Sequence, residues 1–309
     1  TLSSIAFIVN PRAGNGSTGL KWPAIKAHAR NRLGSFKSYV TTGAGEAKHF
    51  TEKAITSGAR LVVCVGGDGT LNEVVNGFME IGESDRSGLS LGFVPGGTGC
   101  DFIKTVSIPK DMEKAIDLIA AGTVRCIDLG RLFFKDHDGR DCRRYFLNIT
   151  SFGLGGEVDQ RVNKTTKAFG PFISFIWATL ISILLYGKKT IRFKVDQSFE
   201  QELIIWNVVV ANGQYHGGGM WVAPDALVDD GLFDITVIGD LSLPEVFLNL
   251  PKLYNGKIKD IDKVITLAGE KIEALSDQRV LLDVDGEQPG MLPVVIDIVP
   301  GALNIITAQ

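Results

Sequence analysis

The feature that most constrains this chain is the run Gly66-Gly67-Asp68-Gly69-Thr70, which separates two segments of different character. The preceding segment, Leu61–Val65, is continuously apolar, as expected of a strand buried on both faces of a sheet. The following segment repeats apolar residues at helical spacing from Leu71, and Thr70 with Glu73 has the spacing of a capping box. A glycine-rich turn between a buried strand and a helix N-terminus is where α/β proteins bind phosphate.

The acidic residue inside this turn makes the prediction more specific. Asp68 would repel a bound phosphate unless a cation lay between the two charges. Carboxylates hold Mg²⁺ directly or through water, so the turn predicts a site for a nucleotide with Mg²⁺. Glycines alone would favour a plain tight turn, but the carboxylate and the hydroxyl of Thr70 favour the functional interpretation.

Two further loops place similar residues after predicted strands. Asn10–Gly16 follows the strand Ile5–Val9, and Pro95–Asp101 follows the strand Leu89–Val94. Loops at the carboxyl ends of parallel strands lie side by side in an open sheet, where ligands usually bind. Each loop alone is weak evidence, whereas together they predict one nucleotide site.

The order of predicted elements indicates two domains. Residues 1–131 alternate strands with helices at 20–33, 46–57, 70–78 and 111–121, which predicts an α/β nucleotide-binding domain with a largely parallel sheet. Residues 132–299 predict a β-rich, antiparallel, sandwich-like domain with a hairpin turn at 135–143, and a last strand within about 300–309 returns to the first domain. We expect the active site in the cleft between the domains. The strands expected in the second domain are 132–134, 144–149, 191–195, 203–211, 233–238, 280–284 and 294–299.

Composition and missing motifs exclude several classes of protein. The formal net charge of −3 gives no overall attraction to nucleic acid, so no nucleic-acid partner is predicted. Walker A and His-Glu-x-x-His patterns are absent, and the four histidines are scattered, which leaves little support for a zinc mechanism. His216 borders a cleft in one interpretation, but a structural role is favoured. The four cysteines form no C-x-x-C pair and no secretory signal is visible, so we expect reduced thiols in a cytoplasmic protein.

The segment Ala168–Tyr186 contains no charged residue and has nearly the length of a membrane span. Gly170-Pro171 interrupts its start, and hydroxyl residues recur along it. A buried or partly buried helix of the second domain is therefore favoured. The alternatives are an apolar surface that meets a lipid or a membrane face and, least favoured, a transmembrane helix.

Seven motifs in sequence order resemble those of the diacylglycerol kinase catalytic family, which includes bacterial lipid kinases and is similar to sphingosine and ceramide kinases. Gly-Gly-Asp-Gly-Thr alone also resembles NAD kinases and phosphofructokinases, whereas an Asp-Gly-Glu after a β-rich domain favours the lipid kinases. One departure is Cys100, where the family usually has Asn, which puts one detail of nucleotide contact in doubt. The motifs are Asn-Pro-x-x-Gly at 10–14, Gly-Gly-Asp-Gly-Thr at 66–70, Pro-x-Gly-Thr-x-x-Asp at 95–101, Tyr215–Gly219, Ala223-Pro224-x-Ala226, Asp229-Asp230-Gly231 and Asp285-Gly286-Glu287.

The resemblance implies a role for each matching residue. Glu287 would be the general base, with Asp285 beside it. Asp68, Asp101 and Asp128 would organise a catalytic Mg²⁺, largely through water. Leu227 and Leu232, through backbone carbonyls, would hold a second, structural Mg²⁺ together with Asp230. The residues that would contact ATP are Asn10, Pro11, Arg12, Ala13, Gly14, Thr41, Gly66, Gly67, Asp68, Gly69, Thr70, Leu71, Asn72 and Thr98.

The function expected from these observations is transfer of the γ-phosphate of ATP, with Mg²⁺, to a hydroxyl of a lipid such as diacylglycerol. Phosphatidylglycerol, a sphingoid base and an undecaprenyl-type alcohol are also allowed acceptors. A lipid substrate implies transient contact with a membrane surface, so a peripheral location at the inner membrane face is allowed. The sequence leaves the oligomeric state open, and a homodimer is allowed. Two alternatives stay open, namely a kinase for a soluble acceptor, similar to NAD kinases, and a catalytically silent nucleotide-binding regulator.

Overall fold

The computed structural model describes residues 4–164, 179 and 181–308, and the chain forms two compact units. Unit 1 contains Thr1–Ile127 and Gly301–Gln309, and unit 2 contains Asp128–Pro300. The boundary therefore falls inside two long strands, β5 (Thr123–Lys135) and β17 (Met291–Thr307). Each unit is described by itself below.

Unit 1 is built around a parallel sheet. Its strands follow the order β2-β1-β3-β4, and the end of β17 lies parallel to β4 through the pair Ile305 and Leu91. This arrangement explains why β3 is continuously apolar, since helices cover both faces of the sheet. The strands are β1 (Ile5–Val9), β2 (Lys37–Val40), β3 (Leu61–Gly66) and β4 (Ser90–Pro95).

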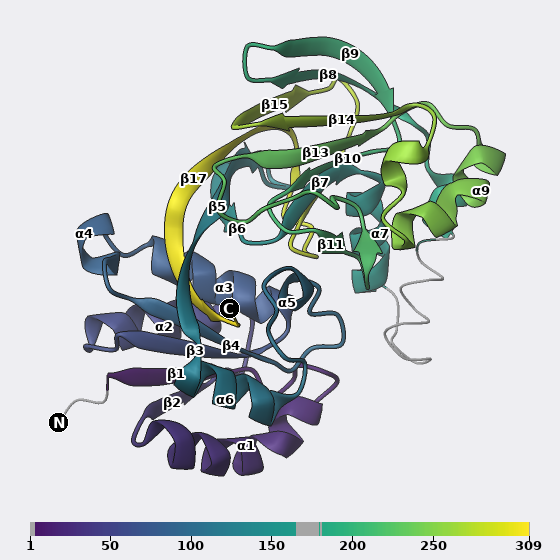
Figure 1. Ribbon diagram of the computed structural model, residues 1–309. Helices are drawn as coiled ribbons and strands as arrows, with labels where there is room; N and C mark the ends of the chain where they lie inside the picture. The colour runs from purple at the N-terminus through teal and green to yellow at the C-terminus, as the bar shows by residue number, and fades with distance from the viewer. Residues whose placement is uncertain (1–3, 165–178, 180, 309) are drawn as a thin grey trace. The chain divides into compact units, whose positions relative to one another are not determined.

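The helices of unit 1 lie on both faces of this sheet. Figure 1 shows α2 and α3 on one face and α1 and α6 on the other. The predicted α/β domain is therefore confirmed. The helices are α1 (Ser17–Leu33), α2 (Glu46–Thr56), α3 (Asp68–Met79), α4 (Glu83–Arg86), α5 (Phe102–Thr105) and α6 (Met112–Ala121).

The predicted capping box at the start of α3 is wrong. The helix begins at Asp68, because Gly67 is extended and serves as N-cap, so Thr70 already lies inside the helix. The Glu73 carboxylate instead accepts the backbone N–H groups of Gly45 (2.9 Å) and Ala47 (3.0 Å) at the start of α2. Glu73 thus holds two helices together, and the start of α3 lies directly at the glycine turn.

Unit 2 is a sandwich of antiparallel strands, as predicted. One sheet has the order β14-β13-β10-β7-β16, and the other contains β17, β15, β8 and β9, with β5 and β6 paired. Apolar side chains from both sheets form the core between them, including Phe146, Phe152, Phe193 and Phe233. The strands are β6 (Asp141–Phe146), β7 (Ile149–Gly153), β8 (Lys189–Val195), β9 (Phe199–Ile205), β10 (Asn207–Ala211), β13 (Phe233–Ile238), β14 (Val264–Gly269), β15 (Lys271–Leu275) and β16 (Leu282–Val284).

Two local predictions in unit 2 have different outcomes. The hairpin at 135–143 is confirmed, because β5 and β6 pair antiparallel up to Lys135 and Asp141. The single strand expected at 203–211 is wrong, since β9 and β10 belong to different sheets. The chain changes sheets at Trp206, whose indole is buried and donates from Nε1 to the carbonyl of Leu241 (2.8 Å).

Several elements of unit 2 were not predicted. They are strands β14 and β15, helices α7 (Leu154–Lys164) and α9 (Leu243–Tyr254), the short 3-10 helix Ile258–Asp260, and a small hairpin of β11 (Tyr215–His216) and β12 (Met220–Trp221). The helix expected at Ala168–Tyr186 lies mostly outside the described residues, which omit 168–178 and 180. Of the described part of this segment, 179 and 181–185 are helical. Within the part of the chain that is described, no helix combines the length and apolar character needed to cross a membrane.

Candidate active site

The predicted nucleotide-binding residues come together at one edge of unit 1. Asn10, Thr41, Gly67 and Thr98 follow the carboxyl ends of β1, β2, β3 and β4. Asn10 donates from Nδ2 to the Thr70 hydroxyl (2.9 Å), and the Thr41 N–H donates to the carbonyl at the end of β1 (2.8 Å). The sequence pattern therefore placed these loops correctly, except that the buried Leu71 side chain belongs to the core, so that only its backbone could contact a ligand.

Close backbone packing between the loops accounts for their glycines. A Cβ on Gly97 would lie 2.7 Å from the Cα of Gly67, closer than real Cβ contacts. A Cβ on Gly14, whose φ is +60°, would lie 2.4 Å from the carbonyl oxygen of Gly96. The three loops therefore fit together only without side chains at these points, which leaves their backbone exposed to a ligand.

Asp68 links two of these loops. Its Oδ2 accepts the backbone N–H of Cys100 (2.8 Å), and the neighbouring Asp101 accepts from the ammonium of Lys104 (2.9 Å). Cys100 has φ +52°, a left-handed conformation that Asn tolerates better than most residues, which explains why Asn is usual here. Burial and, secondarily, the charge of Asp68 raise the pKa of the Cys100 thiol to about 12, so this thiol stays protonated near neutral pH.

The carboxylates of unit 1 fit a Mg²⁺ ion that arrives with a nucleotide. Asp68 and Asp101 offer the hard oxygen donors that Mg²⁺ prefers. Among the described residues, no three His, Cys, Asp or Glu side chains gather as a complete metal site. Proteins usually hold Mg²⁺ with one or two carboxylates while phosphates and water complete its shell, which is the use expected of Asp68 and Asp101.

Asp128, predicted to act with these two carboxylates, lies at the start of unit 2. Its Oδ2 accepts the N–H of Gly231 (2.8 Å), and its own N–H donates to the carbonyl of Val228 (2.7 Å). Asp128 therefore holds the loop that carries the residues predicted for the second metal. In that loop Asp230 accepts the N–H of Leu232 (3.0 Å) in a tight turn.

Further carboxylates accompany this loop. Burial raises the pKa of Asp234, the charges of Asp225 and Asp230 add to the shift, and Lys259, which pairs with Asp225, opposes it. The predicted donors are all oxygens, namely the Asp230 carboxylate and the carbonyls of Leu227 and Leu232, which suits Mg²⁺.

The Asp-Gly-Glu turn of unit 2 is fixed by the carboxylate of Asp285. Its Oδ2 accepts the backbone N–H of Leu147 (2.9 Å), and its Oδ1 accepts those of Asn148 (3.1 Å) and Ile149 (3.0 Å). Asp285 is buried with a φ of +49°. These contacts occupy its oxygens with the fold, so we assign Asp285 as a positioning residue for Glu287.

Glu287 has an exposed carboxylate, with 42% of its side chain accessible. The turn is closed by two backbone hydrogen bonds between Val284 and Glu287, at 2.7 and 3.0 Å. The guanidinium of Arg144, on β6, donates to Oε2 of Glu287. Arg144 was not predicted, because nothing in its sequence neighbourhood marks it.

Unit 2 also contains an apolar pocket of about 240 Å³. It lies on the face of the β10 sheet opposite the sandwich core, because Val208 and Val210 face the core whereas Val209 faces the pocket. Helix α9 forms another wall with Leu250 and Leu253. His216, for which a cleft was the less favoured interpretation, lines this pocket, and so do Thr179 and Ile183 of the segment Ala168–Tyr186, for which a lipid-contacting surface was one alternative.

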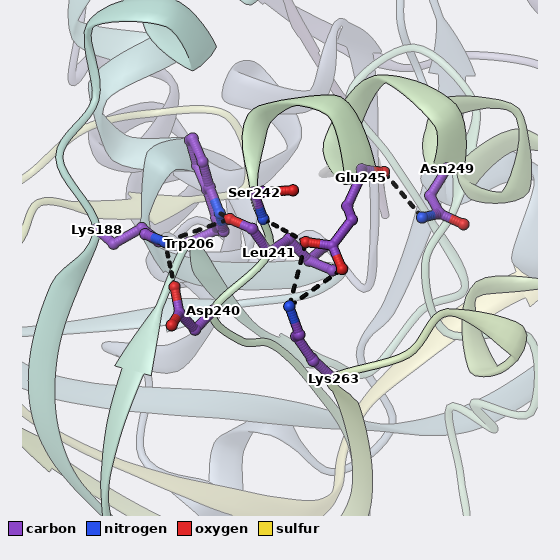
Figure 2. Close-up of polar contacts among 8 residues, drawn as sticks. All are labelled: Lys188, Trp206, Asp240, Leu241, Ser242, Glu245, Asn249 and Lys263. Atoms are coloured by element: carbon purple, nitrogen blue, oxygen red, sulfur yellow. Dashed lines mark hydrogen bonds and ion pairs between the residues drawn. The ribbon is translucent and has the colours of Figure 1, made fainter.

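The start of α9 is anchored against this pocket by polar contacts (Figure 2). The Ser242 N–H donates to the Glu245 carboxylate (2.6 Å) in a capping box, and Lys263 pairs with the same carboxylate (3.1 Å). The Ser242 hydrogen bonds, followed by the contact from Lys263, lower the pKa of Glu245 to about 2. Lys188 pairs with Asp240 just before the helix. These contacts hold the pocket wall in place.

A second pocket, of about 540 Å³, lies beside the nucleotide loops of unit 1. Gly14 and Thr98, two of the residues expected to contact ATP, line it together with Lys21 and Lys110. These two lysines were not predicted. Their ammonium groups are suited to neutralise phosphate charge near the loops.

Comparisons with known proteins agree across nearly the whole chain. Residues 4–132 match the family described as the diacylglycerol kinase catalytic domain, and residues 148–307 match the YegS C-terminal NAD kinase beta sandwich-like domain. A protein of Xanthomonas euvesicatoria named probable lipid kinase YegS-like is 32% identical, with 86% of this chain and 84% of that protein covered. A protein of Bacillus subtilis named diacylglycerol kinase is 28% identical, with 93% and 90% covered.

Solved structures show the same fold. A crystal structure of a diacylglycerol kinase from Bacillus anthracis has a TM-score of 0.74 at 22% identity and covers 99% of this chain and 97% of its own. A structure of yeast NADH kinase with NADH has a TM-score of 0.57 at 12% identity, covering 100% and 84%. At these identities the likeness concerns the fold alone.

The packing of the loops predicts the effect of adding one methyl group. Gly97→Ala should lower the free energy of unfolding by about 1–3 kcal/mol, because the new Cβ meets the backbone of Gly67. It should also weaken nucleotide binding, measured by titration calorimetry with ATP and Mg²⁺. Gly82→Ala is the control, because its Cβ would meet nothing within 4 Å. Equal stability and equal ATP affinity in the two variants would contradict the assigned packing.

Proposed function

The chain belongs to the diacylglycerol kinase family of lipid kinases, and on that premise we propose that it transfers the γ-phosphate of ATP, with Mg²⁺, to a hydroxyl of a lipid such as diacylglycerol. The observation that carries the choice of a lipid acceptor is the apolar pocket of unit 2. A soluble, polar acceptor would gain nothing from walls of leucine, valine and tryptophan, whereas an acyl chain gains free energy for each methylene it buries.

The position of this pocket relative to the Asp-Gly-Glu turn supports the proposal. Hairpin β11–β12 contributes His216 and Met220 to the pocket wall. Asn148 ties this hairpin to the turn, because its Nδ2 donates to the carbonyl of Tyr215 (2.9 Å) and its N–H donates to Asp285 (3.1 Å). The end of the pocket at this hairpin would therefore lie near Glu287, and an acyl chain bound in the pocket would place the lipid head at that end.

The proposed reaction divides its tasks between the two units. The glycine loops of unit 1 would hold the phosphates through backbone N–H groups and the N-terminus of α3. Mg²⁺, held in part by Asp68 and Asp101, would neutralise charge on the transferred phosphoryl group. On unit 2, Glu287 would accept the proton of the lipid hydroxyl, for which its Oε1 can serve while Arg144 donates to Oε2.

The two alternative functions have less support. A kinase for a soluble acceptor would share the fold, as yeast NADH kinase does, but the apolar pocket favours a lipid. A silent regulator would not need Asp68, Asp101 and Glu287 together, and Cys100 adopts a left-handed conformation of the kind that Asn tolerates well. Because the proposed acceptor resides in a bilayer, the protein must reach a membrane surface at least transiently.

The acyl-chain pocket can be tested by fluorescence. A diacylglycerol brominated on one acyl chain should quench the emission of Trp206, which lines the pocket, when added in mixed micelles. Unbrominated diacylglycerol should restore the emission by competition. In Trp206→Phe most of the quenching should disappear while phosphorylation of diacylglycerol continues. Equal quenching in the variant would show that the lipid binds near another tryptophan.

The reaction can be tested by transfer of labelled phosphate from ATP to diacylglycerol, phosphatidylglycerol, a sphingoid base and a long-chain alcohol. Wild type should label a lipid, and Glu287→Gln should reduce kcat by roughly 10²–10⁴-fold, as for loss of a general base, with ATP affinity unchanged. Glu273→Gln, an exposed acid paired with Lys271, is the control. Transfer at wild-type rate in Glu287→Gln would refute the base assignment, and no labelled lipid would refute a lipid acceptor.

A further inference from the structure

One wall of the apolar pocket contains a histidine–carboxylate contact that the proposed reaction does not use. His216 lines the pocket, and its Nε2 lies 2.9 Å from Oδ2 of Asp283. The Asp283 side chain is fully buried, whereas 18% of the His216 side chain is accessible. A fully buried carboxylate is costly unless it is paired and hydrogen-bonded, so its partners here are well defined.

The same carboxylate connects the pocket to the turn that carries Glu287. Asp283 accepts the Ser151 hydroxyl at Oδ2 (3.2 Å) and the Gly286 N–H at Oδ1 (2.9 Å). Gly286 is the middle residue of the Asp-Gly-Glu turn. One side chain, Asp283, therefore fixes both an imidazole in the pocket wall and the backbone beside Glu287.

Two other polar residues that line the pocket make hydrogen bonds within the fold. Asn207 accepts the N–H of Gly155 (3.1 Å), and Asn249 donates to a carbonyl of its own helix (2.8 Å). Tyr254 lies at the exposed end of α9, with 53% of the residue accessible. His216 is distinguished from these residues by its direct contact with a buried carboxylate on the side of the turn.

On the basis of the proposed lipid kinase activity, we infer that His216, oriented by Asp283, recognises the polar head of the acceptor. An imidazole held at Nε2 by a carboxylate has a defined ring orientation, and in its protonated form the second ring N–H would donate to an ester oxygen of a neutral acylglycerol head. His216 is thus a specificity-determining residue, and Asp283 is its positioning residue.

The test compares two acceptors that differ in the head. Diacylglycerol has ester oxygens beside its hydroxyl, and a long-chain primary alcohol has none. His216→Phe should lower kcat/KM for diacylglycerol roughly 10- to 100-fold, with a smaller loss of about threefold or less for the alcohol. The KM for ATP should not change. Asp283→Asn should also lower the ratio of kcat/KM for diacylglycerol to that for the alcohol. His216→Gln, which retains polar atoms, should lower this ratio less than His216→Phe does.

A matched pair on unit 1 provides the control. His28 and Asp117 also lie 2.9 Å apart, far in sequence from the pocket, and His28→Phe should leave the acceptor preference unchanged. Equal losses of kcat/KM on both acceptors in His216→Phe, or no loss, would overturn the inference while leaving the lipid kinase intact. If wild type phosphorylates neither acceptor, the proposed function fails and this inference fails with it. Thermal unfolding of each variant verifies that it is folded. If one of His216→Phe, His216→Gln and Asp283→Asn does not fold, the acceptor preference is measured with the other two.

Discussion

The buried carboxylate of Asp285 is the constraint on which the proposed acceptor site depends. It accepts three consecutive backbone N–H groups, from Leu147 to Ile149, while its own residue adopts a left-handed conformation. Hydrogen bonds to a charged group contribute about 1.5–3 kcal/mol each, enough to hold a turn that would otherwise be strained. Glu287 owes its position to this arrangement. Asn148 and Asp283 connect the same turn to hairpin β11–β12 and so to the apolar pocket.

In unit 1, close backbone packing fixes the positions of the loops. Its loops approach each other so closely at Gly67 and Gly97 that no side chain fits between them. Asp68 joins the two loops by accepting the N–H of Cys100. The proposed nucleotide site is thus formed by closely packed backbone with a carboxylate, whereas the proposed acceptor site is made of side chains around a fixed turn.

The sequence predicts these two kinds of site unequally well. The glycine loops are local patterns that follow apolar strands, so Gly66–Thr70 and its neighbours could be placed before the structure was known. Even there the start of α3 was misjudged, because Glu73 caps α2 instead of its own helix. The pocket escaped prediction because ordinary apolar residues from distant segments, such as Trp206 and Leu253, form it. The spacing of Ser242 and Glu245 was a capping signal that could have revealed α9. Arg144 and the His216–Asp283 pair arise from strand register, which no single-sequence pattern specifies.

Asp285 is proposed to act through Glu287, and a double-mutant cycle on single-turnover transfer from ATP to diacylglycerol tests this coupling. The rates of wild type, Asp285→Asn, Glu287→Gln and the double variant would be measured with ATP and lipid saturating. If Asp285 serves only to position Glu287, the double variant should be no slower than Glu287→Gln alone. If the two losses multiply, Asp285 contributes to transfer independently of Glu287, and the account of this site is wrong.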